Sequence, residues 1–387
     1  MIKRILAIVA VAAMVFSLDL QAKRPSDREI ERELQYIMDE NEVSAMSIAL
    51  VKGNETIYSN ALGFKDREKK QKVGIGDIYR IASVSKSFTG AAVMQLVEKG
   101  LVSLDSDVKD ILGINVRNPL YPDVPVTVRL LLCHCSSIID GKVPYGTVAG
   151  LDMDHPDKTT AKIYAGWAPG ERYDYSNRGI NLLGCVIEKV SGERFDEYVR
   201  NHILVPLGIE NAGFNVDSLD RSKFVTLYKV KDGTYSVAVK AYEPKAEKLV
   251  AKGTYRMGLD APGFAPCGGM KISVLGLAEW MKTLKNRGVG SNGVRILSEE
   301  SVDMMFAKQT PDNVRKKYGF CVNGQSKMLN GRLSHGHNGS AQGLKSCMYF
   351  NPSEDWGVVA MCSSHSKADV LAYKLAAEYL AGVFIDK

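Results

Sequence analysis

The sequence predicts an α+β fold, in which an antiparallel β-sheet is flanked by helices and carries an inserted, mainly helical lobe. Strand patterns occur near both ends of the chain, so the front and back strands can complete one sheet. A helical pattern precedes the front strands and another follows the back strands, and these two helices can cover one face. Between them lies a long interval of helix patterns punctuated by proline and glycine. We therefore expect a sheet lobe built from residues 23–100 and 267–387, and a helical lobe at 101–266.

The first 22 residues have the layout of a Sec-type secretory signal peptide. Lys3 and Arg4 provide a basic start, the apolar run 5–18 follows, and the small residue Ala22 precedes the next basic pair. The run is too short for a comfortable membrane span, and an uncleaved anchor is the alternative that these residues leave open. We expect cleavage of residues 1–22, a secreted or periplasmic protein, and no stable membrane span after cleavage.

The composition is that of an ordinary globular protein. Hydrophobic residues make up 45% of the chain and charged residues 24%, as in packed domains. The net charge of +6 is small for 387 residues, and the basic residues are scattered, so no nucleic-acid partner is expected. The cysteines are odd in number and most have apolar neighbours, which favours buried free thiols over a disulfide framework. They are Cys133, Cys135, Cys185, Cys267, Cys321, Cys347 and Cys362.

The first hundred residues predict a helix, two strands and a second helix. Ser26-Asp-Arg-Glu29 forms a capping box, and apolar residues at helical spacing follow to about Asn41. The stretches 46–51 and 56–58 have strand patterns on either side of a Gly-Asn turn. An apolar helix over 91–98 then ends at a glycine cap.

The remaining chain predicts further helices, one hairpin and the back strands. In the helical lobe we expect helices over 127–132, 178–190 and 194–205, and a hairpin around Lys231-Asp-Gly233. After this lobe we expect a helix over 274–286, strands over 347–350 and 357–361 with a turn between them, and an amphipathic helix over 368–380.

One short motif predicts a catalytic centre, Ser83-Val-Ser-Lys86. A serine hydroxyl is a poor nucleophile until a base takes its proton, and a lysine three residues later on a helix shares the same face. Ser85 and Ser87 do not stand in that relation to Lys86. The same spacing also occurs at 106–109 and 364–367, so it identifies no site by itself.

Two later elements complete the expected site. Tyr175-Ser-Asn177 provides a phenol, whose pKa the Lys86 ammonium would lower so that it can relay protons, and an amide that can hold a substrate. The triplet at 58–60 is identical but falls in a strand pattern. His337-Asn-Gly339-Ser340 predicts a glycine-bearing strand that can approach a substrate closely. The N–H groups of Ser83 and Ser340 would then form an oxyanion hole.

In this order the three elements resemble the serine β-lactamase and penicillin-binding protein superfamily, most closely its class C branch. That branch includes D-alanyl-D-alanine carboxypeptidases, D-aminopeptidases and esterases, and the resemblance covers nearly all of the chain after residue 22. Further segments are similar in the same order, namely Phe88–Gly100, Leu104-Asp105, Thr127–His134, Pro169-Gly170, Leu182–Gly184, Pro206–Gly208 and Gly268-Gly269. The resemblance implies a β-lactamase/transpeptidase-like fold.

The resemblance also implies a role for each site residue. Ser83 would be the acylated nucleophile, Lys86 the group that activates it, and Tyr175 a partner in proton transfer. Asn177 would hold a substrate amide, and His337 takes the place of the lysine in the K-T-G motif of many β-lactamases. This sequence contains no K-T-G. His337 would be mostly neutral at pH 7 and would not supply a permanent charge for a substrate carboxylate, which speaks against efficient antibiotic hydrolysis.

Other site classes receive little support. The match to G-x-G-x-x-G at 288–293 follows a helix pattern rather than a strand and predicts a loop. His335, His337 and the Cys133-His-Cys135 cluster lack zinc-site spacing, and packing explains them better. No G-x-S-x-G occurs, which excludes the nucleophile motif of α/β-hydrolases.

We therefore expect an exported serine hydrolase that needs no metal or organic cofactor. Its substrate would be a small molecule or a cell-wall peptide, with an ester, D-amino-acid peptide or β-lactam carbonyl. The alternative is a non-catalytic or slowly acylating penicillin-binding or cell-wall-sensing module.

Overall fold

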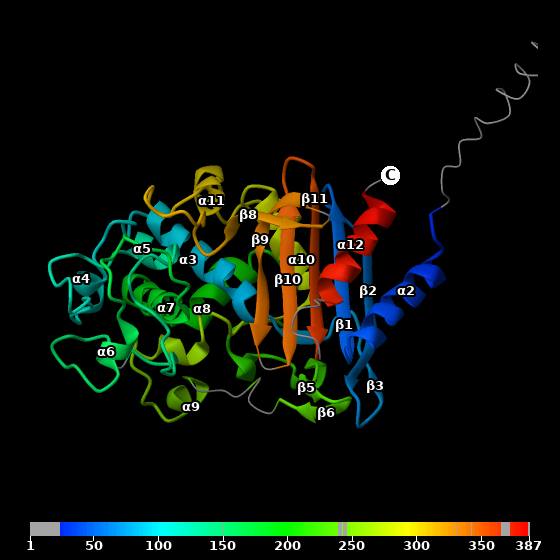
Figure 1. Ribbon diagram of the computed structural model, residues 1–387, viewed down its shortest axis with the longest axis horizontal. Coiled ribbons are helices and arrows are strands. Elements are labelled where there is room, and N and C mark those ends of the chain that lie inside the picture. Colours follow the sequence, from blue (N-terminus) through cyan, green and yellow to red (C-terminus); the bar gives the residue numbers. More distant parts are fainter. Residues whose placement is uncertain are drawn as a thin grey trace, which may run out of the picture.

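The computed structural model describes residues 24–385 except 149, 239–241, 243–245, 330, 342 and 365–371. The expected signal peptide, residues 1–22, and the expected start of the last helix lie outside the described residues. Figure 1 shows a β-sheet with helices on both faces at one end of the molecule, and a mainly helical part at the other end.

The sheet has seven strands in the order β3-β2-β1-β11-β10-β9-β8, and its pairings are antiparallel. The strands are β1 (Ala45–Lys52), β2 (Glu55–Asp66), β3 (Gln71–Lys72), β8 (Asn323–Met328), β9 (Arg332–Ala341), β10 (Leu344–Asn351) and β11 (Trp356–Ser363). Strand β1 pairs with β11, with Ala45 opposite Ser363 and Lys52 opposite Trp356. A strand from the first part of the chain thus lies beside a strand from the last part. The expectation of one sheet formed by front and back strands is confirmed.

Strand β1 has apolar residues on both faces because helices cover both faces of the sheet. Met46 and Ile48 belong to the core cluster under α2 (Asp27–Glu40) and α12 (Ala372–Phe384). Ala45 and Ala49 belong to the larger cluster on the opposite face, toward α10 (Val274–Lys285). The capping box predicted at Ser26 is present and starts α2. The expected covering of one face by the first and last helices is confirmed.

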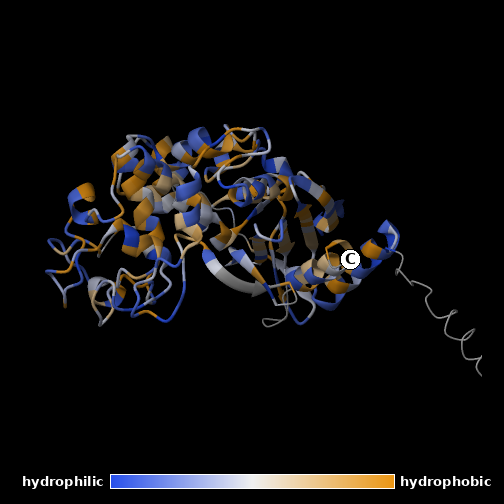
Figure 2. Ribbon diagram, turned by 90° about the horizontal axis from the view of Figure 1, so that it is seen from above, coloured by the Kyte–Doolittle hydropathy of each residue, from blue (hydrophilic) through white to orange (hydrophobic). Residues whose placement is uncertain are grey.

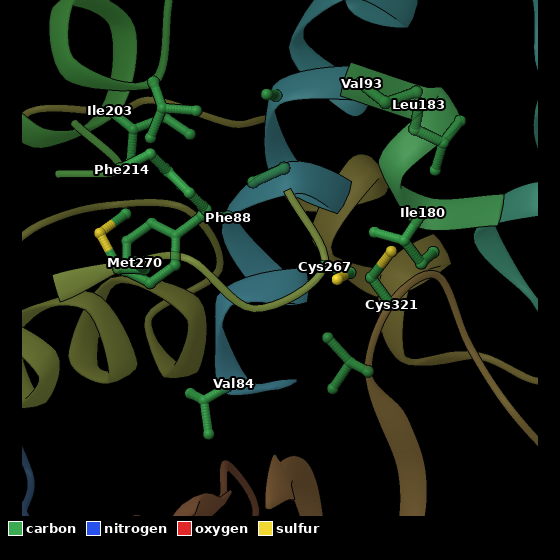
Figure 3. Close-up of a cluster of buried hydrophobic side chains, with 14 of the residues drawn as sticks. Val84, Phe88, Val93, Ile180, Leu183, Ile203, Phe214, Cys267, Met270 and Cys321 are labelled. Carbon is green, nitrogen blue, oxygen red and sulfur yellow. The ribbon is translucent and has the colours of Figure 1, made fainter. Parts of the chain in front are cut away.

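Helix α3 (Lys86–Glu98) runs through the middle of the larger core cluster, and Figure 3 shows side chains from several elements packed around it. Phe88 stacks on Trp280 with ring centroids 4.4 Å apart. A 3₁₀ turn (Ala82–Ser85) precedes α3, so helical structure begins earlier than the predicted residue 91. Polar side chains at this start are satisfied locally, because Ser85 accepts a hydrogen bond from the Met270 N–H and Ser87 accepts one from the Trp280 indole.

The helical part contains α4 (Val108–Leu112), α5 (Val128–Leu132), α6 (Thr160–Ile163), α7 (Asn177–Ser191), α8 (Phe195–Val199) with its π-helical continuation (Arg200–Leu204), and α9 (Ala246–Ala251). The predicted helices after 127, 178 and 194 are confirmed. In Figure 2 the helices carry both hydrophobic and hydrophilic segments, as expected of elements with one buried face.

Two short pairings connect the helical part with the sheet. The predicted hairpin is formed by β5 (Tyr228–Lys231) and β6 (Thr234–Val237), and the Tyr228 hydroxyl accepts a hydrogen bond from the Arg67 N–H beside the sheet. Strand β4 (Ile78–Arg80) pairs with β7 (Lys271–Ser273). The strand just before Ser83 therefore lies beside a segment more than 190 residues later in the chain. The division of the chain into lobes at residues 100 and 266 stays a prediction.

All seven cysteines are buried and unpaired, as the apolar neighbours of most of them suggest.

Within the part of the chain that the structure describes, no helix is both long enough and apolar enough to cross a membrane. The G-x-G-x-x-G match lies in the loop after α10, where Val289 and Arg295 form a β-bridge, and the loop prediction is confirmed.

Candidate active site

Ser83 lies in the 3₁₀ turn between β4 and α3, at a place where the backbone is constrained. The preceding residue, Ala82, has a φ of +47°, which a residue with a side chain adopts only when its surroundings enforce it. Gly339 on β9 packs directly against this turn. A Cβ at position 339 would lie 2.4 Å from the Ile81 carbonyl oxygen and 2.3 Å from Ser346 Oγ, so only glycine fits here.

Lys86 is fully buried at the first turn of α3, and three oxygen atoms surround its ammonium. Its Nζ lies 3.1 Å from Ser83 Oγ and 2.6 Å from the Cys267 carbonyl oxygen. Asn177 Oδ1 is 2.7 Å away. Burial lowers the pKa of Lys86, because it penalises the charged form. A lysine that loses its proton here has a lone pair at the Ser83 hydroxyl, as a general base requires.

Asp140, which sequence reasoning did not single out, orients the Asn177 amide. Its carboxylate accepts hydrogen bonds from Asn177 Nδ2 (2.7 Å) and from the Arg178 N–H (2.9 Å) at the start of α7. This arrangement turns Asn177 Oδ1 toward Lys86. Both polar atoms of the amide are therefore engaged by the protein, and a contact of Asn177 with a substrate amide stays a prediction. No motif marked Asp140, because only folding brings it beside residue 177.

Tyr175 lies against Lys86, with Nζ 4.8 Å from the ring centroid. The expectation that the ammonium lowers the pKa of this phenol is wrong. Burial raises the pKa of Tyr175 well above its usual range, and the neighbouring Ser83 hydroxyl opposes this effect only in part. Tyr175 therefore keeps its proton at neutral pH, and its hydroxyl is a proton donor rather than a phenolate.

His134 supports the other side of the Tyr175 ring, with centroids 4.4 Å apart. Its Nδ1 accepts a hydrogen bond from the Ser176 N–H (3.2 Å), and burial lowers the pKa of His134 well below its usual range. The ring is thus neutral and packs within the site. In the described residues no cluster of three or more histidine, cysteine or acidic side chains is arranged to hold a metal ion.

His337 on β9 is buried and neutral. Its Nδ1–H donates to the Asn338 carbonyl oxygen at 2.5 Å, so the other ring nitrogen, Nε2, can only accept a hydrogen bond. Burial, together with the positive charge of Lys86, lowers the pKa of His337 to about 4. The expectation of a neutral histidine in place of a charged lysine agrees with this environment.

The low pKa of His337 predicts a loss of stability in acid. A histidine whose pKa is about 4 when folded and about 6.5 when unfolded binds its proton more readily in the unfolded chain. The stability it contributes is present above pH 6.5 and is lost as the pH falls toward 4, an effect of about 3 kcal/mol. Urea unfolding at several pH values should show a smaller fall for His337→Asn than for the native protein. His155→Asn should show a fall at least as large as that of the native protein, because Asp152 raises the pKa of His155 and this pair stabilises the fold in acid. A fall in His337→Asn equal to the native one would contradict the prediction.

A pocket of about 300 Å³ opens above Ser83. It is lined by Ser83, Tyr173, Tyr175, Lys316, Tyr318, Asn323, His337, Asn338, Ser340 and Tyr349. The structure thus brings four of the predicted site residues to one pocket, while Lys86, Asn177 and Gly339 are not part of its lining. Sequence reasoning missed the other six lining residues. Two of them had a positional signal, because Asn338 lies within the quoted motif His337–Ser340 and Tyr173 lies two positions before Tyr175.

The edge of β9 forms one wall of this pocket. Pairing of β8 with β9 extends only to Asn323 and Gly336, and the next residues of β9 border the pocket. Ser83 and Ser340 both line it. The role of their N–H groups as an oxyanion hole stays a prediction.

Comparison with known proteins agrees with this geometry. The Beta-lactamase family profile matches residues 30–381. Protein flp of Staphylococcus aureus (strain N315) is 23% identical over 345 residues, which are 88% of this chain and 64% of that protein. This chain therefore corresponds to about two thirds of the length of that relative.

Two solved structures are similar over most of the chain. The octameric penicillin-binding protein homologue from Pyrococcus abyssi is 27% identical, with a TM-score of 0.71 over 92% of this chain and 77% of that one. The D-amino acid amidase from Ochrobactrum anthropi SV3 is 19% identical, with a TM-score of 0.66 over 92% and 98%, and shows the shared fold alone. With its fold, its site geometry and a family match over most of its length, the chain belongs to the Beta-lactamase family.

Proposed function

We propose that this protein is an exported serine hydrolase that cleaves an ester or amide bond through an acyl-enzyme on Ser83. The observation that carries the proposal is the contact between Ser83 and Lys86. A fully buried lysine with a lowered pKa lies 3.1 Å from a serine hydroxyl that faces a pocket. Such a pair matches the requirements for an activated nucleophile. Export is proposed from the signal-peptide layout of residues 1–22.

In the proposed reaction, neutral Lys86 takes the proton of the Ser83 hydroxyl as Oγ attacks the substrate carbonyl carbon. The negative charge that develops on the carbonyl oxygen is stabilised by the N–H groups of Ser83 and Ser340. Tyr175 donates its phenolic proton to the leaving group as the acyl-enzyme forms, and the Lys86 ammonium returns a proton to Tyr175. Water then attacks the acyl-enzyme with the same groups in reversed roles, which releases the acid and restores Ser83.

The absence of a charged side chain at position 337 favours esters and D-amino-acid peptides or amides over β-lactams as rapidly hydrolysed substrates. His337 is uncharged and its one N–H is already donated to the Asn338 carbonyl oxygen, so it is unsuited to hold the carboxylate of a β-lactam. A slowly acylating penicillin-binding module is the second candidate, because the Pyrococcus abyssi neighbour is described as a penicillin-binding protein homologue. The two candidates differ in the rate of deacylation.

Intact-mass spectrometry tests the proposal. The protein without residues 1–22 is mixed with p-nitrophenyl acetate, quenched in acid within seconds, and digested to locate the acetyl group. We expect one acetyl adduct on the peptide that contains Ser83, together with continued release of p-nitrophenol beyond one equivalent. Benzylpenicillin in a parallel reaction should give a longer-lived adduct on the same peptide.

The outcomes separate the two candidates. An acetyl adduct that persists, with no release of p-nitrophenol beyond one equivalent, supports the slowly acylating module, whatever the lifetime of the penicilloyl adduct. An acyl group on any other residue, or no adduct and no turnover with either reagent, would overturn the proposal.

A further inference from the structure

We infer that Lys316 selects substrates that carry a carboxylate or a similar anion at a distance from the bond that is cleaved. The inference rests on the proposed function, because it names the class of substrate that the Ser83 site takes. It concerns a residue in the segment between α11 (Glu299–Phe306) and β8, outside the three motifs of the site.

The pocket above Ser83 has an unbalanced charge. None of its ten lining residues is acidic, and four of them are tyrosines. His337 is neutral, since burial lowers its pKa to about 4. Lys316 is therefore the one side chain among the lining residues that carries a full charge at neutral pH.

The ammonium of Lys316 is available to a ligand. Its backbone is anchored, because its carbonyl oxygen accepts a hydrogen bond from the buried Thr310 hydroxyl at 2.5 Å. Its side chain is exposed at the pocket, and within the described residues it takes part in no ion pair. A lysine with a fixed backbone and no acidic partner is suited to bind an anion in the pocket that it lines.

Neighbouring cations add to the same field. Burial is the main cause of the lowered pKa of His337, and the charge of Lys316 adds to it, so this charge acts on a side chain of the pocket lining. Lys345 on β10 donates a hydrogen bond from Nζ to Ser340 Oγ at 2.9 Å, on the strand edge beside the pocket. A pocket that is lined by Lys316 and has Lys345 bound to its Ser340 attracts anionic substrates and repels cationic ones.

The size of the pocket limits the substrate class further. A volume of about 300 Å³ is at the lower end for small-molecule sites. We therefore expect short acyl compounds whose anion reaches Lys316 while their carbonyl lies at Ser83. Because His337 cannot supply a charge from β9, Lys316 would supply it from the segment before Tyr318.

Two matched pairs of esters test the inference. The first pair is mono-p-nitrophenyl adipate and its methyl ester, with the charge on the acyl group. The second is 4-acetoxybenzoate and its methyl ester, with the charge on the leaving group. We measure kcat/KM for all four at low and high salt, after subtracting uncatalysed hydrolysis, with native protein, Lys316→Gln and Lys317→Gln. Lys317 is a neighbouring exposed lysine that is not part of the pocket lining.

For at least one pair, we expect Lys316→Gln to reduce the ratio of charged to neutral ester by about tenfold at low salt, as for a lost charge-assisted contact. Lys317→Gln should keep the native ratio, and high salt should reduce the native ratio. The pair that responds shows whether the anion belongs to the acyl or the leaving group. An unchanged ratio in Lys316→Gln for both pairs would overturn the inference while leaving the hydrolase proposal intact. Absence of Ser83-dependent turnover of the neutral esters would instead mean that the proposed function fails, and the inference with it.

Discussion

Replacing Ser83 with alanine is expected to lower kcat/KM for p-nitrophenyl acetate by about 10⁴-fold or more, close to the uncatalysed rate. The substitution removes the only atom in the proposed reaction that forms a covalent bond with the acyl group. The Ser83 hydroxyl makes a hydrogen bond with Lys86, but the fold does not depend on it, because Lys86 keeps Asn177 and Cys267 as partners. Steady-state kinetics together with the circular dichroism spectrum and the unfolding midpoint would check the prediction.

The chain offers a matched control for this experiment. Ser106 also precedes a lysine by three residues, but it lies in the helical part before α4. Ser106→Ala should keep native kcat/KM, since the spacing has no catalytic meaning at that place. Retention of Ser83→Ala activity within tenfold of the native value would count decisively against an acyl-enzyme on this serine.

The second large effect is expected at Lys86, where methionine should reduce kcat/KM by about 10³-fold, as for loss of a general base. Lys86→Arg should be similarly inactive, because an arginine keeps its charge but does not release its proton near neutral pH. The two variants distinguish a general base from a residue that acts only through its positive charge, since arginine would restore activity if the charge alone were needed. Lys109→Met, at the matched control motif, should leave kcat/KM unchanged.

The pH dependence provides an independent check on Lys86. Catalysis needs the neutral amine, so kcat/KM should rise with pH through the pKa of this residue. Burial lowers that pKa below the usual 10.5, so the midpoint of the rise should lie below that value. The groups around Lys86 that act against burial are Cys267, Cys321, Asp140 and Tyr145. A profile that falls with rising pH over this range would contradict the assignment of Lys86 as the base.

Removing the Lys86 ammonium also has a cost in stability. Methionine at this position leaves Asn177 Oδ1 and the Cys267 carbonyl oxygen without their buried donor, which costs about 1–3 kcal/mol for each unsatisfied group. Relief of a buried charge offsets part of this cost. Activity should therefore be measured well below the unfolding midpoint of the variant, so that loss of base and loss of fold stay separate.

Local sequence was sufficient for the parts of the molecule whose geometry is local. The capping box at Ser26, the strand patterns at both ends and the helices after 127, 178 and 194 were predicted because each depends on residues within one or two turns. The pairing of Ser83 with Lys86 belongs to the same class, since a separation of three residues at a helix start determines that the two side chains meet.

Properties set by burial were harder to infer. The ammonium of Lys86 was expected to lower the pKa of Tyr175, yet the surroundings of the phenol raise it. The ring of His134, from a distant segment, packs against Tyr175, and the ring of Tyr318 packs in turn against His134. The sign of a pKa shift depends on the balance between desolvation by burial and the nearby charges. The sequence shows which residues are charged, but burial is known only from the fold.

By itself, the sequence predicted the contact between Ser83 and Lys86, the order of the motifs and the two-ended sheet, because these follow from short-range spacing and hydrophobic periodicity. Only the tertiary structure decided the rest. It placed Asn177 and the Cys267 carbonyl at Lys86, Asp140 beside Asn177, and Lys316 in the lining of the pocket. It also showed that Gly339 is required, since a Cβ there would collide with Ile81 and Ser346. These contacts join residues far apart in the chain, and their geometry exists only once the sheet and the helices have packed.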